Sequence, residues 1–362
     1  MKKLLWAFVC CALVSCTGNP ERQSSAPPQY KVDPFWPKPL PGNWILGQVA
    51  GIAVDKNDNI WIVHRPTTLL DDEKGAQKNP PETKCCTAAP AVLQFDQAGN
   101  LLRSWGGPGQ GYDWFESEHG IEVDNDGNVW VGGNSPKDHH LVQFTPEGKF
   151  IRQLGKPGKS EGSNSTTQLG RPAHMKVDAA ANELYVADGY GNRRIIVFDA
   201  KTLAYKRHWG AYGERPNDDK LPAYDPAKAM RTFQNPVHCV RFSNDGLVYV
   251  CDRQNDRIQV FEKSGKFVKE IFVERETLQN GSVWDLVLSE DRDQKYIIVA
   301  NGASGYLLVV DRQSGQTLGT FSRPGRMAGE LRWVHNLAID SKGNVYTAEV
   351  GFGRRAQKFT KQ

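Results

Sequence analysis

Gly51-Ile-Ala-Val-Asp55, a polar turn and then Ile60-Trp-Ile-Val63 form the stretch that decides the fold, because the chain repeats it. In the copies a short apolar segment leads into a turn, and a second apolar segment follows. Apolar segments separated by turn residues in this way are typical of antiparallel β-strands. The further copies are Gly120-Ile-Glu-Val-Asp124 with Asn128-Val-Trp-Val131, Met175-Lys-Val-Asp178 with Glu183-Leu-Tyr-Val186, Cys239-Val-Arg-Phe242 with Leu247-Val-Tyr-Val250, Leu286-Val-Leu288 with Tyr296-Ile-Ile-Val299, and Leu337-Ala-Ile-Asp340 with Asn344-Val-Tyr346.

Later strands repeat as well. After the first pair they are Val92-Leu-Gln-Phe-Asp96 and Leu101-Leu-Arg-Ser-Trp105, and similar segments follow later pairs. Four strands in a repeat of roughly 40–50 residues are the signature of a β-propeller blade, which cannot bury both of its faces alone. We therefore predict an all-β fold, a six-bladed β-propeller.

The sixth copy stops after its third strand, at Ala356-Gln-Lys-Phe-Thr360. The missing outer strand is available from Tyr30-Lys-Val-Asp33. We expect this N-terminal strand to close the ring, since closure removes an exposed sheet edge. A solenoid with two open ends is the alternative, although neither terminus resembles a polar cap.

The composition narrows the classes of partner. The chain has 362 residues, of which 39% are hydrophobic and 24% charged, and its formal net charge is +4. Lys and Arg are spread along the sequence without a dense basic block, which argues against nucleic acid and against a polybasic membrane contact. We expect a monomer whose partner is a small-molecule or peptide substrate.

Residues 1–15 are typical of a bacterial lipoprotein signal peptide. Two lysines precede Leu4–Val14, an apolar segment that is too short to span a bilayer stably. This segment runs into Leu13-Val14-Ser15-Cys16, which resembles a lipobox, so we predict lipidation at Cys16. An ordinary secretory signal with an incidental cysteine is the alternative.

Residues 16–29 are rich in Ser, Pro and polar residues, and we expect them to form a flexible tether before a propeller of residues 30–362. Thr17 stands where an inner-membrane retention signal usually has Asp. We therefore expect a protein of the bacterial cell envelope, held by its lipid at the outer membrane and facing the periplasm. No other stretch of the sequence is apolar and long enough to cross a membrane.

Four cysteines lie beyond Cys16, and export favours their oxidation. A turn centred on Asp245 places Cys239 directly opposite Cys251, at a Cα separation of roughly 4.5–5.5 Å that a disulfide accepts. Cys85 and Cys86 then pair with each other or remain thiols. The alternative for Cys239 and Cys251 is that they are small buried hydrophobes.

Antiparallel topology gathers the unusual side chains at one end of the central channel, which we call the mouth. There the first strand of each blade begins and the second strand ends. First strands begin near His119, His174, His238 and His335, and second strands end near His64, Arg65, Asp188, Tyr190, Asp252, Arg253 and Glu349. The insertion at residues 66–90 leaves the first blade at the same end. Several histidines on one axis predict a metal site, because neutral imidazole suits zinc, copper, iron and nickel.

Each non-histidine candidate also has a structural explanation. The alternative for Arg65 and Arg253 is an ion pair with a surface Asp or Glu, which contributes little stability. Asp252 belongs to an Asp-x-x-Asn-x-Arg-Ile pattern that is often a hydrogen-bonded turn, and Tyr190 could fill the gap between blades.

The chain resembles NHL-repeat β-propellers, and among them the peptidyl-α-hydroxyglycine α-amidating lyases, also called peptidylamidoglycolate lyases. The resemblance covers nearly all of the chain beyond the signal. Its sharpest parts are Leu46-Gly-Gln-Val-Ala-Gly51 leading to Val63-His-Arg65, Glu118-His-Gly-Ile121, Asp188-Gly-Tyr-Gly-Asn192, and Asp252-Arg253 leading to Arg257-Ile258.

The resemblance implies a set of roles for these positions. Three histidines hold a catalytic zinc in that family, and the matching residues are His119, His238 and His335. The catalytic tyrosine of the family matches Tyr190. Its two functional arginines match Arg65 and Arg253.

Three positions depart from the family pattern. The middle histidine of the family directly follows a proline, whereas Val237 intervenes before His238, which therefore needs a β-bulge to reach the metal. His174 follows its proline with the same offset and is an alternative ligand. The residue after the last histidine, an acidic calcium ligand in the family, is Asn336, so a structural calcium ion would be bound with less charge.

The expected function is that of a metal-dependent C–N lyase that releases glyoxylate and an amide from an α-hydroxyglycine substrate. One alternative is a non-catalytic binding propeller of the periplasm or cell surface. Another is a different hydrolase or lyase, in which the insertion at residues 66–90 has changed the pocket.

Overall fold

The recurring turn is built around the carboxylate that follows a first strand. Asp55 Oδ1 accepts the backbone N–H groups of Asn57 and Asn59, each at 2.9 Å. Asp124 and Asp340 hold the turns of their own repeats in the same way. The side chain thereby pairs backbone donors inside the turn, which fixes the turn and with it the register of the hairpin.

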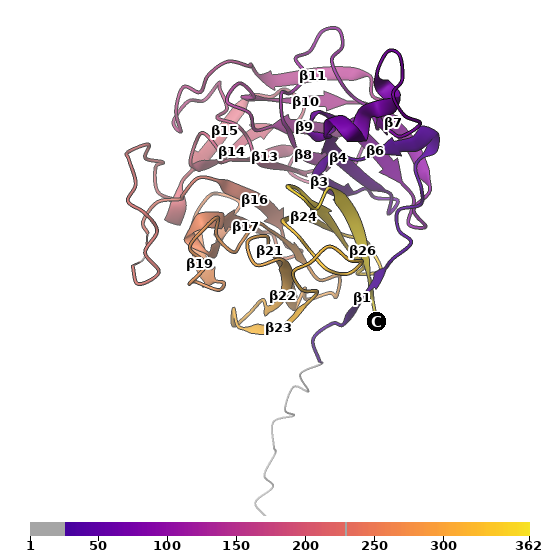
Figure 1. Ribbon diagram of the computed structural model, residues 1–362. Coiled ribbons are helices and arrows are strands. Elements are labelled where there is room, and N and C mark those ends of the chain that lie inside the picture. Colours follow the sequence, from indigo (N-terminus) through magenta and orange to yellow (C-terminus); the bar gives the residue numbers. More distant parts are fainter. Residues whose placement is uncertain (1–25, 229) are drawn as a thin grey trace, which may run out of the picture.

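Six four-stranded antiparallel sheets surround a central axis in this computed structural model, which describes residues 26–228 and 230–362 (Figure 1). The predicted signal peptide, Cys16 and the first part of the predicted tether lie outside the described residues. Each sheet is one blade. From the innermost to the outermost strand the blades are β3 (Gln48–Val54), β4 (Ile60–Arg65), β6 (Val92–Phe95) and β7 (Leu101–Trp105); β8 (Glu118–Val123), β9 (Val129–Gly133), β10 (His140–Phe144) and β11 (Phe150–Gly155); β12 (His174–Asp178), β13 (Glu183–Asp188), β14 (Arg194–Asp199) and β15 (Tyr205–Trp209); β16 (Val237–Phe242), β17 (Leu247–Asp252), β18 (Arg257–Glu262) and β19 (Phe267–Phe272); β20 (Asp285–Leu288), β21 (Tyr296–Asn301), β22 (Tyr306–Asp311) and β23 (Thr317–Phe321); and β24 (Val334–Ile339), β25 (Val345–Glu349), β26 (Arg355–Lys361) and β1 (Tyr30–Asp33).

The innermost strands form a ring around the channel. Each of them contacts the innermost strand of the next blade, in the order β3, β8, β12, β16, β20, β24 and back to β3. The prediction of a six-bladed propeller is confirmed. In the sixth blade β1 pairs antiparallel with β26, and Tyr30 lies opposite Lys361, close to the C-terminus (Figure 1).

The two ends of the propeller carry connections of different length. Inner hairpins at the end opposite the mouth have short turns such as residues 55–59, whereas residues 66–91, 156–173 and 210–236 are long connections at the mouth. Long connections in a compact domain are often functional. Within the described ranges, no helix is long and apolar enough to cross a bilayer.

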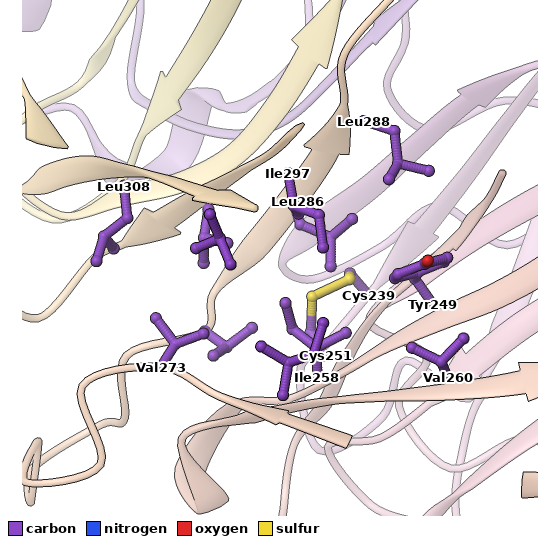
Figure 2. Close-up of a cluster of buried hydrophobic side chains, with 14 residues drawn as sticks. Cys239, Tyr249, Cys251, Ile258, Val260, Val273, Leu286, Leu288, Ile297 and Leu308 are labelled. Atoms are coloured by element: carbon purple, nitrogen blue, oxygen red, sulfur yellow. A yellow bond between two sulfur atoms is a disulfide. The ribbon is translucent and has the colours of Figure 1, made fainter. Parts of the chain in front are cut away.

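A disulfide joins the two innermost strands of the fourth blade. Cys239 on β16 lies directly opposite Cys251 on β17, with their Cα atoms 4.8 Å apart. Both cysteines are fully buried in an apolar cluster (Figure 2). The cluster includes Ile258 of the same blade and Leu286 of the next blade. The disulfide therefore fixes the strand that carries His238 and is protected from solvent by its neighbours.

Replacing both Cys239 and Cys251 by alanine should lower the free energy of unfolding of the oxidised protein by about 2–4 kcal/mol, because the disulfide closes a loop in the unfolded chain. Chemical denaturation measures this difference, and protein kept reduced gives the matched control. Recovery of both cysteines as free thiols in peptide maps of the oxidised protein would contradict the pairing.

Candidate metal centre

Four of the six innermost strands carry a register shift at the mouth. On β8, β16 and β24 the shift presents a histidine, whereas on β3 it leaves Ala50 unpaired. The pairing of β16 with β17 shifts between Val237 and Cys239, so His238 is the extra residue. An equivalent shift in the pairing of β24 with β25 leaves His335 as the extra residue. In the pairing of β8 with β9 the shift lies between Glu118 and Ile121 and includes His119. A bulge turns a side chain out of the regular alternation of the strand, which here directs the rings toward the axis.

Each of these rings is held by a backbone carbonyl group of the next blade. His119 Nδ1 lies 2.7 Å from the carbonyl oxygen of Ala173, and His335 Nδ1 lies 2.6 Å from that of Ala50. His238 Nδ1 makes the equivalent hydrogen bond to the carbonyl oxygen of Trp284. Because Nδ1 carries the proton in such a bond, Nε2 is left with a lone pair, which is the arrangement found in metal-binding histidines.

Close packing of the blades permits these bonds. Gly120 follows His119, and a Cβ atom at this position would lie 2.9 Å from the carbonyl oxygen of Ala173. A larger residue would therefore push away the very oxygen that holds the His119 ring. A residue without a side chain is therefore required at this point of contact between β8 and β12.

The three imidazole rings form a nearly symmetric group on the channel axis. One potential ligand nitrogen from each of His119, His238 and His335 lies within 4.8 Å of the other two, and the ring centroids are 4.6–5.3 Å apart. All three residues are almost completely buried. Three nitrogen ligands with an open fourth position make up the usual donor set of a catalytic zinc site. The group could therefore hold a metal ion.

The surroundings keep these imidazoles neutral. Burial lowers the pKa of His119 well below its usual value, and the neighbouring His335 and His238 lower it further. Burial has the same effect on His238, and it lowers the pKa of His335 to about 3. Neutral imidazole is the form that binds a metal, so the site does not have to release protons before it is occupied.

His174, the alternative ligand, does not join this group. It begins β12 without a bulge, in regular pairing opposite Ala187. Its Nδ1 accepts the N–H group of Val240 at 3.5 Å, and its buried Nε2 has no hydrogen-bond partner among the described residues. The absence of a bulge thus explains why two similar Pro-x-His segments place their rings differently.

Tyr190 faces the triad from the turn between β13 and β14. Its Oη atom lies 2.9 Å from His119 Nε2 and 3.1 Å from His238 Nε2. Gly189 brings the turn into direct contact with β16, since a Cβ atom there would lie 2.0 Å from the carbonyl oxygen of Val237. The phenol group is therefore within hydrogen-bond reach of the space between the imidazoles.

Arg65 and Arg253 approach the same space from opposite parts of the ring. Arg65 donates from Nε to the carbonyl oxygen of Glu118 at 2.7 Å and is close enough to His119 and His335 to lower their pKa values. Arg253 is buried and lowers the pKa of His238. Its Nη1 lies 3.5 Å from Tyr190 Oη. Two cationic groups beside three neutral imidazoles favour an anionic ligand.

The carboxylates at the mouth have structural roles. Asp252 accepts a hydrogen bond from the backbone of Gln234 at 3.0 Å and pairs with buried Arg257 at 2.8 Å. Asp188 and Glu349 make the equivalent contacts in their own blades. These pairs tie the connection between blades to the end of the second strand, so the Asp-x-x-Asn-x-Arg pattern belongs to the fold.

Two residues at the mouth were not predicted from the sequence. Trp284 precedes β20, at the position that the histidines occupy in other blades, and its ring centroid lies 4.3 Å from Arg253 Cζ. Arg171 lies before β12, and its Cζ is 5.7 Å from the centroid of the Tyr190 ring. Both residues lie beside the start of a first strand, and this position could have identified them. The sequence prediction considered only histidines at first-strand starts, so it did not include them.

The insertion at residues 66–90 folds over the boundary between the first and sixth blades. It contains the short helices η2 (Pro66–Thr68) and η3 (Asp71–Gln77), and Glu73 forms an ion pair of 2.6 Å with Arg354 of the sixth blade. Cys85 and Cys86 are joined to each other. Its strand β5 (Thr87–Ala88) pairs with β2 (Trp44–Ile45).

The residues around Asn336 do not fit a calcium site. Its amide oxygen accepts the N–H group of Ile52 at 2.8 Å, and its amide nitrogen donates to Asp285. The Asp285 carboxylate also accepts hydrogen bonds from Arg241 and from the backbone of Leu337. Arg241 donates in addition to the carbonyl oxygen of Leu337 at 2.7 Å. A guanidinium group therefore already occupies the oxygen atoms that a cation would need.

Comparisons with known proteins agree with this architecture. No protein-family profile matches the chain. The chain is 26% identical to mouse NHL repeat-containing protein 3 over 353 residues, covering 92% of this chain and 84% of that protein. It is 25% identical over 322 residues to a probable peptidyl-α-hydroxyglycine α-amidating lyase of Caenorhabditis elegans, covering 84% and 80%. These proteins are homologues of the chain.

Two further proteins are similar to the chain, one over part of its length and one in fold. The peptidyl-glycine α-amidating monooxygenase B of Xenopus laevis is 27% identical over 317 residues, which cover 85% of this chain and only 33% of that protein. The chain thus spans about a third of the length of this relative. A streptogramin B lyase structure superimposes with a TM-score of 0.53 over 92% of this chain and 98% of its own, at 11% identity, which supports the fold alone.

The protein should bind about one divalent metal ion per chain through the triad. Single alanine substitutions of His119, His238 and His335 should each remove most of it, which elemental analysis measures on variants that retain the circular dichroism spectrum of the fold. His174→Ala is the matched control, because its ring is as buried as those of the triad, and it should keep the metal. Wild-type metal content in the triple variant would refute the assignment.

Calcium should have no effect on stability. The thermal midpoint of the dialysed protein should not change when calcium is added, and calcium content should stay well below one ion per chain. Arg241→Met should lower the free energy of unfolding by about 3–5 kcal/mol, because it leaves a buried carboxylate unpaired. A rise in the wild-type midpoint with calcium would show that the Arg241 network does not replace the ion.

Proposed function

We propose that the chain is a zinc-dependent C–N lyase that converts an α-hydroxyglycine amide into glyoxylate and the free amide. One observation carries the proposal, namely a buried group of three neutral histidines that shares its open side with Tyr190 and with two arginines. Homology to α-amidating lyases at about 25% identity supports the same reaction class. The proposal concerns the activity of the propeller alone.

Zinc fits the donor set. Three imidazole nitrogens held by backbone carbonyls, with a fourth position free, match catalytic zinc sites in number and type of ligand. A zinc ion bound there would act as a Lewis acid on the hydroxyl oxygen of the substrate. The almost complete burial of His119, His238 and His335 would strengthen that effect by excluding water.

Arg65 and Arg253 would hold the carboxylate of the substrate. The Arg65 guanidinium is fixed by Glu118 O, by Gln48 Oε1 at 3.0 Å and by Asn134 Oδ1 at 3.3 Å, so its orientation is set before the substrate arrives. A preorganised guanidinium group loses less freedom on binding a carboxylate. Arg253 is positioned by its contact with Trp284.

Tyr190 would move the proton. Its Oη atom lies where a hydroxyl group held between the histidines would be within hydrogen-bond reach. In the reaction Tyr190 accepts the hydroxyl proton, the carbon–oxygen double bond of glyoxylate forms, and the carbon–nitrogen bond breaks. The departing amide nitrogen takes up a proton, so the net change is the transfer of one proton from oxygen to nitrogen.

The proposal places the enzyme in the bacterial envelope, lipidated at Cys16 and facing the periplasm. Tyr30, the first residue of β1, lies opposite Lys361, at the end of the propeller away from the mouth. A tether that starts there would leave the mouth directed away from the membrane. The protein would act as a monomer on small or peptide substrates that reach it by diffusion.

A binding propeller without catalysis is the second candidate. It is favoured by the similarity to NHL repeat-containing protein 3, which covers 92% of this chain. A binding module would not need a tyrosine within hydrogen-bond reach of two metal-binding imidazoles. Turnover therefore separates the two candidates.

The zinc-loaded protein should release glyoxylate from α-hydroxyglycine peptides, which a coupled dehydrogenase assay measures. Tyr190→Phe should lower kcat by about 10²- to 10⁴-fold, the usual contribution of a general base, while the zinc content stays the same. Arg65→Ala should mainly raise KM, because it removes one group that holds the carboxylate.

Tyr205→Phe is a control for the tyrosine substitution, since Tyr205 lies exposed on the outer strand β15. It should leave turnover unchanged. Absence of glyoxylate from every such peptide, in fully zinc-loaded protein, would exclude the lyase and leave the binding propeller or a different hydrolase or lyase.

A further inference from the structure

Three arginines beside Tyr190 form no ion pair with a carboxylate among the described residues. The guanidinium hydrogen bonds of Arg65, Arg171 and Arg253 all go to neutral oxygens within the described part of the chain, namely those of Glu118 O, Gln48, Asn134 and Tyr190. Other mouth arginines, such as Arg194 and Arg257, pair with buried carboxylates instead. Arg65, Arg171 and Arg253 are distinguished from other arginines without a carboxylate partner, such as Arg193, by their place beside Tyr190.

Arg171 is held close to the reacting groups. Its Nε donates to the carbonyl oxygen of Asn134 at 2.9 Å, while the side chain of Asn134 accepts from Arg65 at 3.3 Å. Its own carbonyl oxygen accepts the N–H group of Tyr190 at 3.2 Å. Asn134 thus sits between two guanidinium groups, and Arg171 is bonded to the backbone of the tyrosine that faces the triad.

The backbone of Arg171 supports a specific placement. Its φ angle is +60°, a left-handed conformation that residues other than glycine seldom adopt. The residue is only partly exposed, and its Cζ atom lies 5.7 Å from the centroid of the Tyr190 ring. Two of its guanidinium nitrogens have no hydrogen-bond partner in the described chain and remain available to a ligand.

The carboxylates near the site act on Arg65 and leave Arg171 without an ion pair. Glu118 and Asp138 interact electrostatically with Arg65, whereas Arg171 forms no ion pair among the described residues. In the proposed reaction Arg65 and Arg253 hold the carboxylate of the hydroxyglycine unit. A ligand with a second negative charge would therefore gain an attraction to Arg171 that a monoanionic ligand lacks.

We propose that Arg171 is a specificity-determining residue that binds a second carboxylate, carried by the acyl or peptidyl part of the substrate. The inference rests on the proposed lyase function and narrows its substrates to dianionic α-hydroxyglycine amides. The second carboxylate would belong to an acidic side chain or to a dicarboxylic acyl group. It would reach Arg171 across the ring of Tyr190, while the first carboxylate stays with Arg65 and Arg253.

Matched substrates test this inference. N-succinyl-α-hydroxyglycine and N-succinamoyl-α-hydroxyglycine have nearly the same size and differ by one negative charge; glutaryl and glutaramoyl compounds extend the pair by one methylene group. The wild type should prefer the anionic member by about 10- to 100-fold in kcat/KM, the contribution of one charge-assisted hydrogen-bonded contact. Arg171→Gln should abolish the preference, and Arg171→Lys should retain part of it.

Arg326→Gln is the control for a general loss of positive charge at the same end of the propeller. Arg326 is exposed and contacts the ring of Phe352, far from Tyr190 in the sequence of blades. This variant should keep the wild-type preference. An equal loss of preference in Arg326→Gln and Arg171→Gln would overturn the assignment of a specific contact.

A binding measurement separates this inference from the lyase proposal. N-succinylglycine and N-succinamoylglycine lack the hydroxyl group and cannot react, so calorimetry reports their affinities without turnover. The wild type should bind the dianion more tightly by the same factor, and Arg171→Gln should bind both equally. Equal wild-type affinities would refute the role of Arg171 even if glyoxylate is released, whereas a preserved preference without turnover would refute only the lyase.

Discussion

The hydrogen bonds from histidine Nδ1 to the backbone carbonyls of the next blade are the interaction on which the rest of the structure depends. His119, His238 and His335 come from the second, fourth and sixth blades, and their acceptors Ala173, Trp284 and Ala50 stand at the starts of the third, fifth and first. Each bond links two blades and also fixes the tautomer that leaves Nε2 free. The same three bonds therefore connect the blades and orient the triad, and the bond from His335 to Ala50 joins β24 to β3 across the closure of the ring.

The pattern of charge at the mouth follows from the same geometry. Burial keeps the imidazoles neutral, and the carboxylates that end the second strands are paired with arginines of their own blades. Beside Tyr190, the guanidinium groups of Arg65, Arg171 and Arg253 donate their hydrogen bonds to neutral oxygens. An unpaired charge near a buried site is costly for stability, so these groups indicate a ligand and its sign. One level further along the axis Arg241 and Asp285 form an ion pair with each other.

Local chemistry made much of this predictable from the sequence. Polar turns set the register of the inner hairpins, as Asp55 does in the first blade. In the fourth blade the turn between Ser243 and Leu247 places Cys239 opposite Cys251. The antiparallel topology places the first-strand starts at one end. His238 and His174 follow proline with the same spacing, and the sequence left them as alternatives. The choice between them depends on whether the strand bulges against its partner, which is a property of the pairing of β16 with β17 and of β12 with β13. The misfit of calcium at Asn336 was beyond local reasoning, because it arises from Arg241, a residue two blades away in the ring.

The central claim is that a zinc ion is held by three histidine Nε2 atoms, with a fourth position free for the substrate. X-ray absorption at the zinc edge of the metal-loaded protein tests it most directly. The account predicts three imidazole nitrogens at about 2.0–2.1 Å and one further light atom. It also predicts that adding N-succinylglycine changes only that fourth ligand. A sulfur atom at about 2.3 Å, which would bring Cys85 or Cys86 to the metal, or a shell with fewer than three imidazoles, would contradict it.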